Sequence, residues 1–367
     1  MNTSHLLQDA QKAAQAFLPG SSISQVERIG NGHINFTFLV TTPERRYLLQ
    51  KINSDIFPNT RGLIQNIALV CAHLRKQVLA RGEDPDRLTM TLLPTATGDY
   101  LYQAADNHFW RMYLYIENTV SLSQSQTPQQ FYQSARAFGQ FQRDLNDFDA
   151  AQLIEILPHF HDTRARYQQL LDAISKNAAG RLDKVAPELD FVMQRKDQFG
   201  ILMDALESGL LPLRVTHNDT KLNNVLLDEN TFEPICVIDL DTVMPGLALN
   251  DFGDSIRFGA STAAEDETDL SKVHFSMEYY EAYVRGFLES CGSLLTPKER
   301  ELLPLGAWMM TMECGMRFLA DHLNGDTYFQ ISRPGQNLDR ARTQFRLAQE
   351  MEANRKAMLE IVQMYSR

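Results

Sequence analysis

Four polar side chains in the middle of the chain have the types and the order that a phosphoryl-transfer site requires. Asp219 follows His217 by two residues and precedes Asn224 by five. Asp239 ends a second apolar run, 20 residues after Asp219. In kinases, one Asp accepts the proton of the acceptor hydroxyl, while an Asn and another Asp hold magnesium. The first three residues match the catalytic-loop pattern H-R-D-x-x-x-x-N, with Asn218 at the Arg position.

The elements around these residues are suited to bring them to one place. The apolar runs 213–216 and 235–238 read as short strands, and the loop after a strand can aim a carboxylate into a cleft. Lys221, two residues after Asp219, is suited to neutralise charge on the transferred phosphoryl oxygens. The alternative is an ordinary polar turn with Asp239 as a strand-end cap, because Asn and Asp favour turns. The presence of both parts in the kinase order favours phosphoryl transfer.

This segment resembles the aminoglycoside phosphotransferase and choline kinase superfamily, small-molecule kinases with the protein-kinase fold. Within the superfamily, the chain resembles bacterial kinases of the N-acetylhexosamine 1-kinase type along almost its whole length. The segments that carry the resemblance are GHIN at 32–35, IFPNT at 56–60, HFHDT at 159–163, VTHNDTKLNN at 215–224, VIDLDTVMPG at 237–246, DFGDSIRFGAS at 251–261, LSKVHFS at 270–276 and MECGMRFLAD at 312–321.

The resemblance implies an α+β, bilobal protein-kinase-like fold with the active site between the lobes. Its N-lobe, residues 1–119, would hold a small antiparallel sheet and the nucleotide, and its C-lobe, residues 120–367, would be mostly helical. The pattern agrees, because strand-like runs fill 26–53, a polar Ser/Gln/Thr/Pro tract covers 121–130, and helical periodicity follows. The expected helices include residues 61–80, 160–175 and 188–208.

Two places in the N-lobe are candidates for binding the nucleotide phosphates. The corner at Gly32 would let backbone amides approach them, although Asn-Gly between strands is also the commonest hairpin signal. The superfamily usually carries a Lys or Arg on the third strand, paired with a Glu on the next helix, but here Gln50 takes that position. Lys51 follows on the opposite strand face, and the helix at 61–80 contains no Glu. Either a bulge brings Lys51 to the phosphates, or Gln50 replaces the cation.

By the same resemblance, adenine and substrate sites can be placed on the chain. Backbone groups just after the strand at 109–117 would bind the adenine, and side chains from both lobes would contact the acceptor. The candidates for adenine are Ile116, Glu117 and Asn118, and those for the substrate are His33, Asn35, Asp254, Arg317 and Tyr328.

The helix around 306–322 carries charges within an apolar run. Glu313, Arg317 and Asp321 are spaced by four, so they share one helical face. One interpretation is an exposed row of ion pairs, which is worth only tenths of a kcal/mol. Because the helix is apolar nearly all round, we expect it to be buried, where charges more often face a polar cleft.

Three further motifs have competing interpretations. Asp251 opens a D-F-G sequence like that of protein kinases, but Asp239 is the better metal ligand because it ends a β-branched strand. The resemblance to the superfamily implies that Asp251 braces the catalytic loop instead. Asp241 shares a strand face with Asp239 and either supports the metal or is solvated. The motif at 159–162, His-Phe-His-Asp, is expected to pack beneath the catalytic loop rather than bind a transition metal.

The composition of the 367-residue chain limits its partners. A formal net charge of −11 argues against a nucleic-acid surface, which requires Lys and Arg. The four cysteines are far apart, as in proteins of a reducing compartment. No signal peptide or membrane span is visible, so we expect a cytoplasmic protein without membrane partners. The sequence does not specify an oligomeric state.

These observations predict an ATP- and Mg²⁺-dependent kinase that phosphorylates the anomeric 1-hydroxyl of an N-acetylhexosamine. Asp219 and Lys221 would be catalytic, and Asn224 and Asp239 would hold the metal. One alternative is a kinase on the same scaffold that acts on an aminoglycoside, an amino alcohol or another sugar. The other is a non-catalytic sugar- or nucleotide-binding relative.

Overall fold

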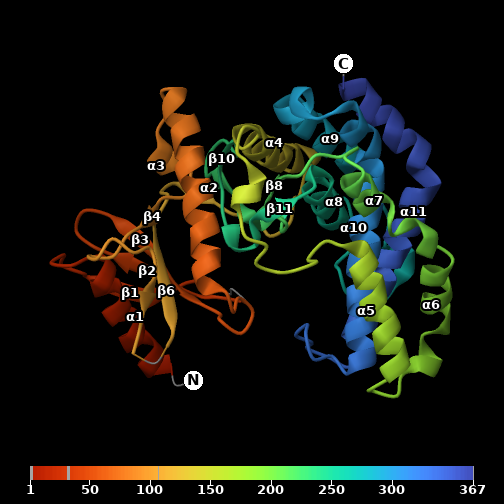
Figure 1. Ribbon diagram of the computed structural model, residues 1–367, viewed down its shortest axis with the longest axis horizontal. Coiled ribbons are helices and arrows are strands. Elements are labelled where there is room, and N and C mark those ends of the chain that lie inside the picture. Colours follow the sequence, from red (N-terminus) through yellow and green to blue (C-terminus); the bar gives the residue numbers. More distant parts are fainter. Residues whose placement is uncertain (1–2, 31–33, 106, 367) are drawn as a thin grey trace. The chain divides into compact units, whose positions relative to one another are not determined.

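Figure 1 shows the computed structural model of the chain, which describes residues 3–30, 34–105 and 107–366. The chain forms two compact units, and each takes segments from several parts of the sequence. The first unit comprises Met1–Val120, Ala151–Leu157 and Leu226–Met244, and the second comprises Ser121–Ala150, Pro158–Val225 and Pro245–Arg367.

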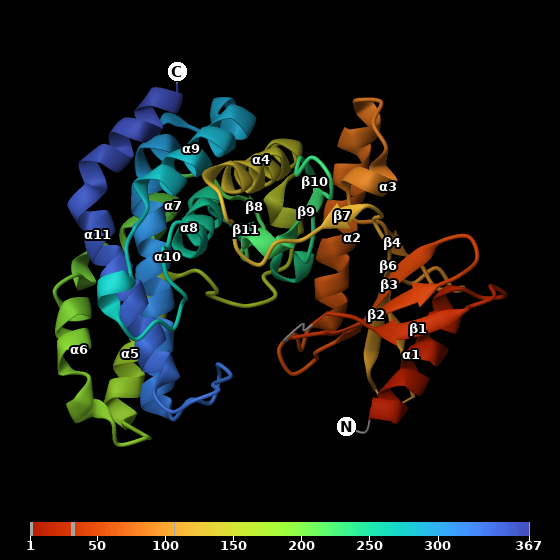
Figure 2. The same cartoon turned by 180° about the vertical axis from the view of Figure 1, so that it is seen from behind.

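The first unit is built on an antiparallel sheet, visible from both sides in Figures 1 and 2. Its strand order is β1-β2-β3-β6-β4, with β5 also paired to β6. The strands are β1 (Gln25–Arg28), β2 (Phe36–Thr41), β3 (Arg46–Ile52), β4 (Leu92–Leu93), β5 (Tyr102–Gln103) and β6 (Phe109–Leu114). The prediction of strands within 26–53 is confirmed by β1 to β3.

The two faces of this sheet differ in chemistry because side chains alternate along each strand. Phe38, Leu49 and Met112 are cross-strand partners and pack with helix α1 (Thr3–Phe17) in one apolar cluster. On the other face, Gln50 is the cross-strand partner of both Thr37 and Arg111. One face is therefore a hydrophobic core, and the other carries polar side chains.

Helix α2 (Thr60–Ala80) follows the third strand, as predicted for residues 61–80. The side chain of Asn59 caps it by accepting a hydrogen bond from the Gly62 amide, and apolar residues such as Leu63, Ile67 and Leu74 are buried at helical spacing. The short helix α3 (Pro85–Leu88) comes next. A second sheet has the order β10-β9-β7, with β7 (Thr119–Val120), β9 (Val225–Asp228) and β10 (Pro234–Val237).

The second unit is helical, and the long α10 (Pro297–Asn324) is buried along most of its length. Its other helices are α4 (Pro128–Asp144), α5 (Thr163–Lys176), α6 (Ala186–Met193), α7 (Ile201–Glu207), α8 (Ala248–Gly259), α9 (Met277–Cys291) and α11 (Gln336–Tyr365). The short strand β8 (Arg214–Thr216) pairs with β11 (Met244–Gly246). Thus the predicted fold class, α+β with an antiparallel sheet first and helices after it, is confirmed.

Close backbone contact joins α8 and α10. A Cβ atom added to Gly253 would overlap the carbonyl oxygen of Gly306, so only glycine fits at this crossing. Gly253 is the last residue of the D-F-G sequence. In this protein, that glycine therefore serves the packing of two helices.

One predicted helix is wrong in its extent. The segment 188–208 forms two helices, α6 and α7, with a 3₁₀ turn at Lys196–Gln198 between them. The ring of Phe199, just after this turn, stacks on Trp308 with 6.1 Å between ring centroids. Gly200, a poor helix former, directly precedes α7, so the break lies where a weak helix former follows a buried aromatic ring.

None of the helices in the described part of the chain is long and apolar enough to cross a membrane.

Candidate active site

The predicted catalytic loop follows β8 directly in the second unit. Asn218 has a left-handed backbone conformation with φ of 66°, which asparagine tolerates better than most residues. The loop continues into a 3₁₀ turn at Leu222–Asn224. The turn brings Asn224 back to Asp219, since the Asn224 side-chain amide donates to the main-chain carbonyl (2.8 Å) and to Oδ2 (3.1 Å) of Asp219.

Asp251 on α8 holds the start of this loop. Its Oδ2 atom accepts hydrogen bonds from the His217 amide (2.9 Å) and from Gln142 Nε2 (2.9 Å), and its Oδ1 atom accepts one from the Asn218 amide (2.8 Å). Burial raises the pKa of Asp251, although the charge of His217 and the two main-chain amides oppose this shift. The predicted bracing role of Asp251 is confirmed.

Lys221 lies beside the carboxylate of Asp219. Its Nζ atom is 2.7 Å from Asp219 Oδ1, and both side chains keep about a third of their surface exposed, 35% and 30%. Burial by itself would lower the pKa of Lys221, but the negative charges of Asp219 and Asp254 outweigh that effect and raise it. The side chain of Lys221 is therefore positively charged at neutral pH and lies next to the predicted base.

The His-Phe-His-Asp motif packs beneath the loop, as predicted. His161 places Nε2 at 3.1 Å from the Asn218 carbonyl oxygen and Nδ1 at 2.8 Å from Glu313 Oε1. Through these two ring nitrogens, His161 links α10 to the catalytic loop. Thr163 donates a further hydrogen bond to Glu313 (3.0 Å).

Asp254, a predicted substrate residue, is engaged inside the second unit. Its Oδ2 atom accepts a hydrogen bond from the Thr220 amide (3.0 Å), and its Oδ1 atom pairs with Arg257 (3.0 Å). Burial opposes its ionisation, but the charges of Arg257 and Lys221 keep the pKa of Asp254 below its usual range. In this arrangement Asp254 supports the loop together with Asp251.

Of the predicted sugar residues, Arg317 lies on α10 one turn after Glu313, and Tyr328 lies in the segment that follows α10. The guanidinium of Arg317 lies 5.5 Å from the ring centroids of both Phe160 and Phe329. Tyr328 is 66% exposed. Asp321 accepts hydrogen bonds from the main-chain amides of residues 327, 328 and 329, so it orders the segment that carries Tyr328.

The charged row on α10 is therefore not a set of ion pairs among its own members. Glu313 binds His161, Arg317 stacks on aromatic rings, and Asp321 caps a loop. A second cation, Arg166, is near Arg317. Burial, followed by the repulsion from Arg317, lowers the pKa of Arg166.

In the first unit, the predicted metal ligand Asp239 lies at a sharp backbone turn. Its φ and ψ are 62° and 60°, and it begins the 3₁₀ turn at Leu240–Thr242. Asp241 is buried, so the solvated alternative for this residue is wrong. It forms an ion pair with Arg111 of β6 and accepts a 2.6 Å hydrogen bond from Asn35.

Gln50 occupies the β3 position at which the superfamily usually carries a cation. It is connected through Arg111 to Asp241 and Asn35, and we call these four residues the polar cluster. Gln50 accepts a hydrogen bond from Arg111 Nε (2.9 Å) and donates one to Thr37 (3.2 Å). The pairing of β2 with β3 is uninterrupted from Phe36↔Lys51 to Thr41↔Arg46. These strands contain no bulge, and Lys51 stays on the face opposite Gln50.

The predicted adenine segment follows β6. The carbonyl oxygens of all three residues accept internal hydrogen bonds: Ile116 from Thr119, Glu117 from Arg87, and Asn118 from the Glu229 amide. The Glu117 side chain also pairs with Arg46. Two other predicted residues, Gly32 and His33, lie outside the described part of the chain.

The donor set named for magnesium is chemically suitable. Asn224 uses its amide nitrogen for both contacts with Asp219, which leaves its amide oxygen for other partners. Asp239 supplies a carboxylate, and Mg²⁺ is bound by such hard oxygen atoms with only one or two protein carboxylates. Each of the two residues therefore has an oxygen donor of the type that magnesium prefers.

Arg111, which contacts both Gln50 and Asp241, was not among the residues predicted from the sequence. It lies within the apolar run Phe109–Leu114 and is 1% exposed. Burial disfavours its charge, but the carboxylate of Asp241 outweighs this and raises the pKa of Arg111. A single Arg within an apolar strand is the signal that could have identified it, because such a charge must find a buried partner.

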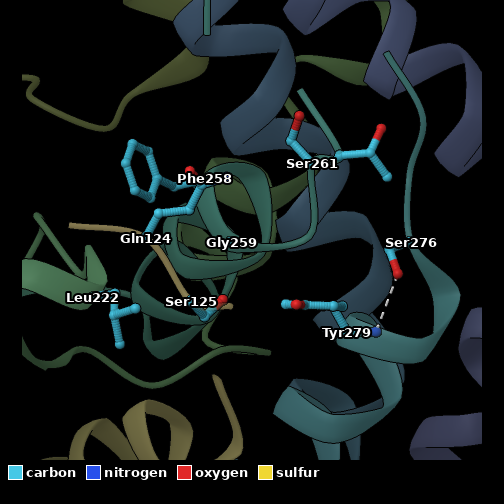
Figure 3. A pocket seen from close by; sticks show the side chains of 9 residues that line it. Gln124, Ser125, Leu222, Phe258, Gly259, Ser261, Ser276 and Tyr279 are labelled. Carbon is cyan, nitrogen blue, oxygen red and sulfur yellow. Dashed lines mark hydrogen bonds between the residues drawn. The ribbon is translucent and has the colours of Figure 1, made fainter. Parts of the chain in front are cut away.

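The second unit also contains a pocket of about 240 Å³, shown in Figure 3. Phe258 and Tyr279 supply aromatic surface, and Leu222 of the catalytic loop forms part of its wall. Its other lining residues are Gln124, Ser125, Gly259, Ser261, Thr262 and Ser276. The lining carries no charged side chain, so the pocket suits a neutral group.

Comparisons with known proteins agree with this geometry. The sequence profile of the phosphotransferase enzyme family (APH) matches residues 25–294. Among solved structures, a microcompartment-associated aminopropanol kinase is similar at 17% identity and a TM-score of 0.57, with 95% of this chain and 98% of that chain covered. An aminoglycoside phosphotransferase from Alicyclobacillus acidocaldarius shares 13% identity and a TM-score of 0.56, covering 94% and 92%. A choline kinase from Cryptosporidium parvum shares 14% identity and a TM-score of 0.59, covering 100% and 99%.

At identities of 13–17%, the solved structures show that the kinase-like fold is shared. The family profile covers most of the chain, including the loop around Asp219 that Asp251 holds. The chain belongs to the APH phosphotransferase enzyme family.

Proposed function

We propose that this protein is an ATP- and Mg²⁺-dependent kinase that transfers the γ-phosphoryl group to the 1-hydroxyl of an N-acetylhexosamine. One observation carries the proposal. Asp219 lies in a loop fixed by Asp251, with Lys221 at 2.7 Å and Asn224 hydrogen-bonded to it. Membership of the phosphotransferase family supports the reaction class. The choice of sugar rests on the sequence resemblance and on the surroundings of Arg317.

In the proposed reaction, Asp219 accepts the proton of the acceptor hydroxyl while the sugar oxygen forms a bond to the γ-phosphorus. The bond from that phosphorus to the bridging oxygen breaks, and ADP leaves with the electron pair. Lys221 offsets the negative charge that accumulates near Asp219. Asn224 and Asp239 would hold magnesium, which when bound neutralises the phosphate oxygens.

The surroundings of Arg317 favour a neutral acceptor over a cationic one. The guanidinium of Arg317 lies near that of Arg166, and none of the described acidic side chains forms an ion pair with Arg317. Relatives named for aminopropanol and choline act on amino alcohols. A positively charged acceptor would be repelled by two guanidinium groups, whereas the hydroxyl and acetamide oxygens of a sugar can accept hydrogen bonds from Arg317. Tyr328, exposed on the segment that Asp321 orders, is proposed as a second sugar contact.

For the nucleotide, we propose Gln50 as the neutral replacement for the usual β3 cation. Its face of the sheet also carries Arg111, whereas Lys51 lies on the opposite face. Backbone groups of Ile116, Glu117 and Asn118 are proposed for the adenine, and Gly32 and His33 for the phosphates and the acceptor. Asn35 binds Asp241, so its proposed role is support rather than direct contact with substrate.

The proposed compartment is the cytoplasm, because all four cysteines are buried free thiols. Burial raises the pKa of Cys71 to about 12, which keeps this thiol protonated and unreactive.

The test is a coupled assay of ADP release across a panel of acceptors: N-acetylglucosamine, N-acetylgalactosamine, neutral hexoses, ethanolamine, choline and an aminoglycoside. We expect the highest kcat/KM with an N-acetylhexosamine. Phosphorus NMR of the product should show coupling to the anomeric proton. Turnover confined to cationic acceptors would refute the sugar proposal, and nucleotide binding without turnover on any acceptor would favour a non-catalytic relative.

A further inference from the structure

Within the first unit, a buried ion pair connects the sheet to the turn that carries Asp239. Arg111 on β6 is 1% exposed, and its partner Asp241 is 5% exposed. Asp241 follows Asp239 by two residues within one 3₁₀ turn. The pair that is usual in the superfamily, a β3 cation with a Glu on the next helix, has no counterpart in β3 and α2, because Gln50 occupies the position of the cation and α2 contains no Glu.

Three contacts fix Arg111 and Asp241 in place. Arg111 Nε donates to Gln50 Oε1 at 2.9 Å, so the guanidinium is oriented by the neighbouring strand. Asn35 donates from its side-chain amide to Asp241 Oδ2 at 2.6 Å. The same Asn35 accepts a hydrogen bond from the Asn53 amide at 3.0 Å, which ties it to the end of β3. Asp241 is therefore held by β6 and by the β2–β3 region at once.

Asp239 begins the same 3₁₀ turn, two residues before Asp241. Its backbone is left-handed, a conformation that residues with a side chain adopt less readily than glycine. The contacts of Asp241 with Arg111 and Asn35 lie two residues from this position. The negative charge of Asp239 also contributes to the raised pKa of Arg111, so the guanidinium is close enough to interact with both carboxylates.

We infer that Arg111 is a positioning residue for the metal ligand: by binding Asp241, it fixes the turn that presents the carboxylate of Asp239. The ion pair between sheet and metal-bearing turn thus replaces the expected pair between sheet and helix. This inference rests on the proposed role of Asp239 as a magnesium ligand. Groups that orient a metal ligand without touching the metal commonly change its affinity by about 10–100-fold.

A second interpretation of the same contacts predicts the opposite result. If Asp241 were itself a metal ligand, Arg111 would compete with the ion for its carboxylate. Removing the guanidinium would then leave metal affinity unchanged or increase it. If Asp241 is an anchor, removing Arg111 frees the turn and lowers the affinity.

The experiment measures Mn²⁺ binding to the full chain with saturating ADP by electron paramagnetic resonance, which reports free and bound ion without any turnover. The variants are Arg111→Gln, the neutral pair Arg111→Gln with Asp241→Asn, and Asn35→Ala. The neutral pair leaves no buried charge without a partner, which preserves folding if the single Arg111 variant is unstable. The control is Arg195→Gln with Glu352→Gln, a doubly hydrogen-bonded pair in the second unit.

We expect the Mn²⁺ dissociation constant to rise about 10–100-fold in the two Arg111 variants. Asn35→Ala should raise it by a smaller factor, and the control should leave it unchanged. Wild-type or tighter Mn²⁺ binding in the Arg111 variants would overturn the inference.

Asp239→Asn, measured alongside, separates this inference from the proposed function. If Asp239→Asn weakens Mn²⁺ binding while the Arg111 variants do not, only the positioning role fails. If Asp239→Asn binds Mn²⁺ like the wild type, the metal assignment fails and the inference fails with it.

Discussion

Replacing Asp251 with Asn tests how the catalytic loop is held. In the native protein, three N–H donors point at this carboxylate: the main-chain amides of His217 and Asn218 and the side-chain amide of Gln142. An Asn side chain offers one acceptor oxygen and one NH₂ group. Its best orientation keeps the oxygen opposite His217 and Gln142, so the NH₂ group faces the Asn218 amide. One hydrogen bond is thereby replaced by a contact between two donors.

The expected loss of stability follows from this exchange. A hydrogen bond to a charged acceptor contributes about 1.5–3 kcal/mol, and a buried donor without an acceptor costs a similar amount. Burial raises the pKa of Asp251, so removal of the charge recovers part of that loss. We therefore expect the free energy of unfolding to fall by about 1–3 kcal/mol. Because Asn218 directly precedes Asp219, the released loop should lower kcat about 10–100-fold.

The assay pairs urea unfolding with steady-state ADP release, and its control is Glu352→Gln. Glu352 also accepts several hydrogen bonds within the second unit, from Arg195 and from Trp308 Nε1. The control should lose stability with little change in kcat, because these contacts do not involve residues 217–224. An Asp251→Asn protein that is less stable but keeps the wild-type kcat would refute the bracing argument.

Three further predictions concern the second unit. Lys221→Met should lower kcat about 100-fold, because the positive charge beside Asp219 is lost. The pKa of Lys221 is raised above 10.5, so the side chain loses its charge only above that pH. The kcat of the wild type, measured from pH 7 to 10, should therefore show no alkaline decline from this group. Glu313→Gln removes a buried carboxylate that contacts His161 and accepts a hydrogen bond from Thr163, and it should lower the unfolding free energy by about 1–3 kcal/mol in urea titrations. Unchanged stability would contradict the role of these contacts in joining α10 to the catalytic loop. Arg317→Lys should raise the KM for the acceptor about tenfold with a smaller effect on kcat, because Lys lacks the planar, paired N–H donors of the guanidinium group. An unchanged KM would show that Arg317 is not part of the sugar site.

Much of the catalytic loop could be predicted because its parts are close in the sequence. The H-N-D-x-x-x-x-N spacing places Asp219 and Asn224 in one turn, and the structure joins them by hydrogen bonds. Asp251 was predicted to brace the loop rather than to bind metal, and its contacts with His217 and Asn218 bear this out. Local spacing was sufficient for Asp219 and Asn224, whereas the role of Asp251, which is more than 30 residues from its partners, was predicted from the family resemblance.

The Arg111–Asp241 pair could not be predicted in the same way. Its partners are 130 positions apart, and their contact depends on the register between β3 and β6 and on the path of the chain to Asp239. In the sequence, Arg111 reads only as an interruption of an apolar strand. An exposed row of ion pairs was likewise one interpretation of the charges on α10. In the structure the helix is buried, Glu313 contacts His161, and Arg317 stacks on the ring of Phe160.

The break at Lys196–Gln198 shows the opposite limit, where a local pattern predicts too much regularity. The break lies beside Gly200, a poor helix former, and beside Phe199, whose ring stacks on Trp308. The prediction of one continuous helix gave too little weight to this glycine, and the contact of Phe199 with a residue more than a hundred positions away could not be foreseen from the local sequence.

The central claim is that Asp219 acts as the base for a hydroxyl acceptor, and one comparison tests it most directly. Wild type and Asp219→Asn are each mixed with ATP, Mg²⁺ and N-acetylglucosamine or N-acetylgalactosamine, and single-turnover product formation is measured beside the ATP dissociation constant. We predict that Asp219→Asn loses product formation by at least about a thousandfold while ATP binding stays close to wild type. Sugar 1-phosphate formed at the wild-type rate, or ATP binding lost together with the carboxylate, would contradict the account.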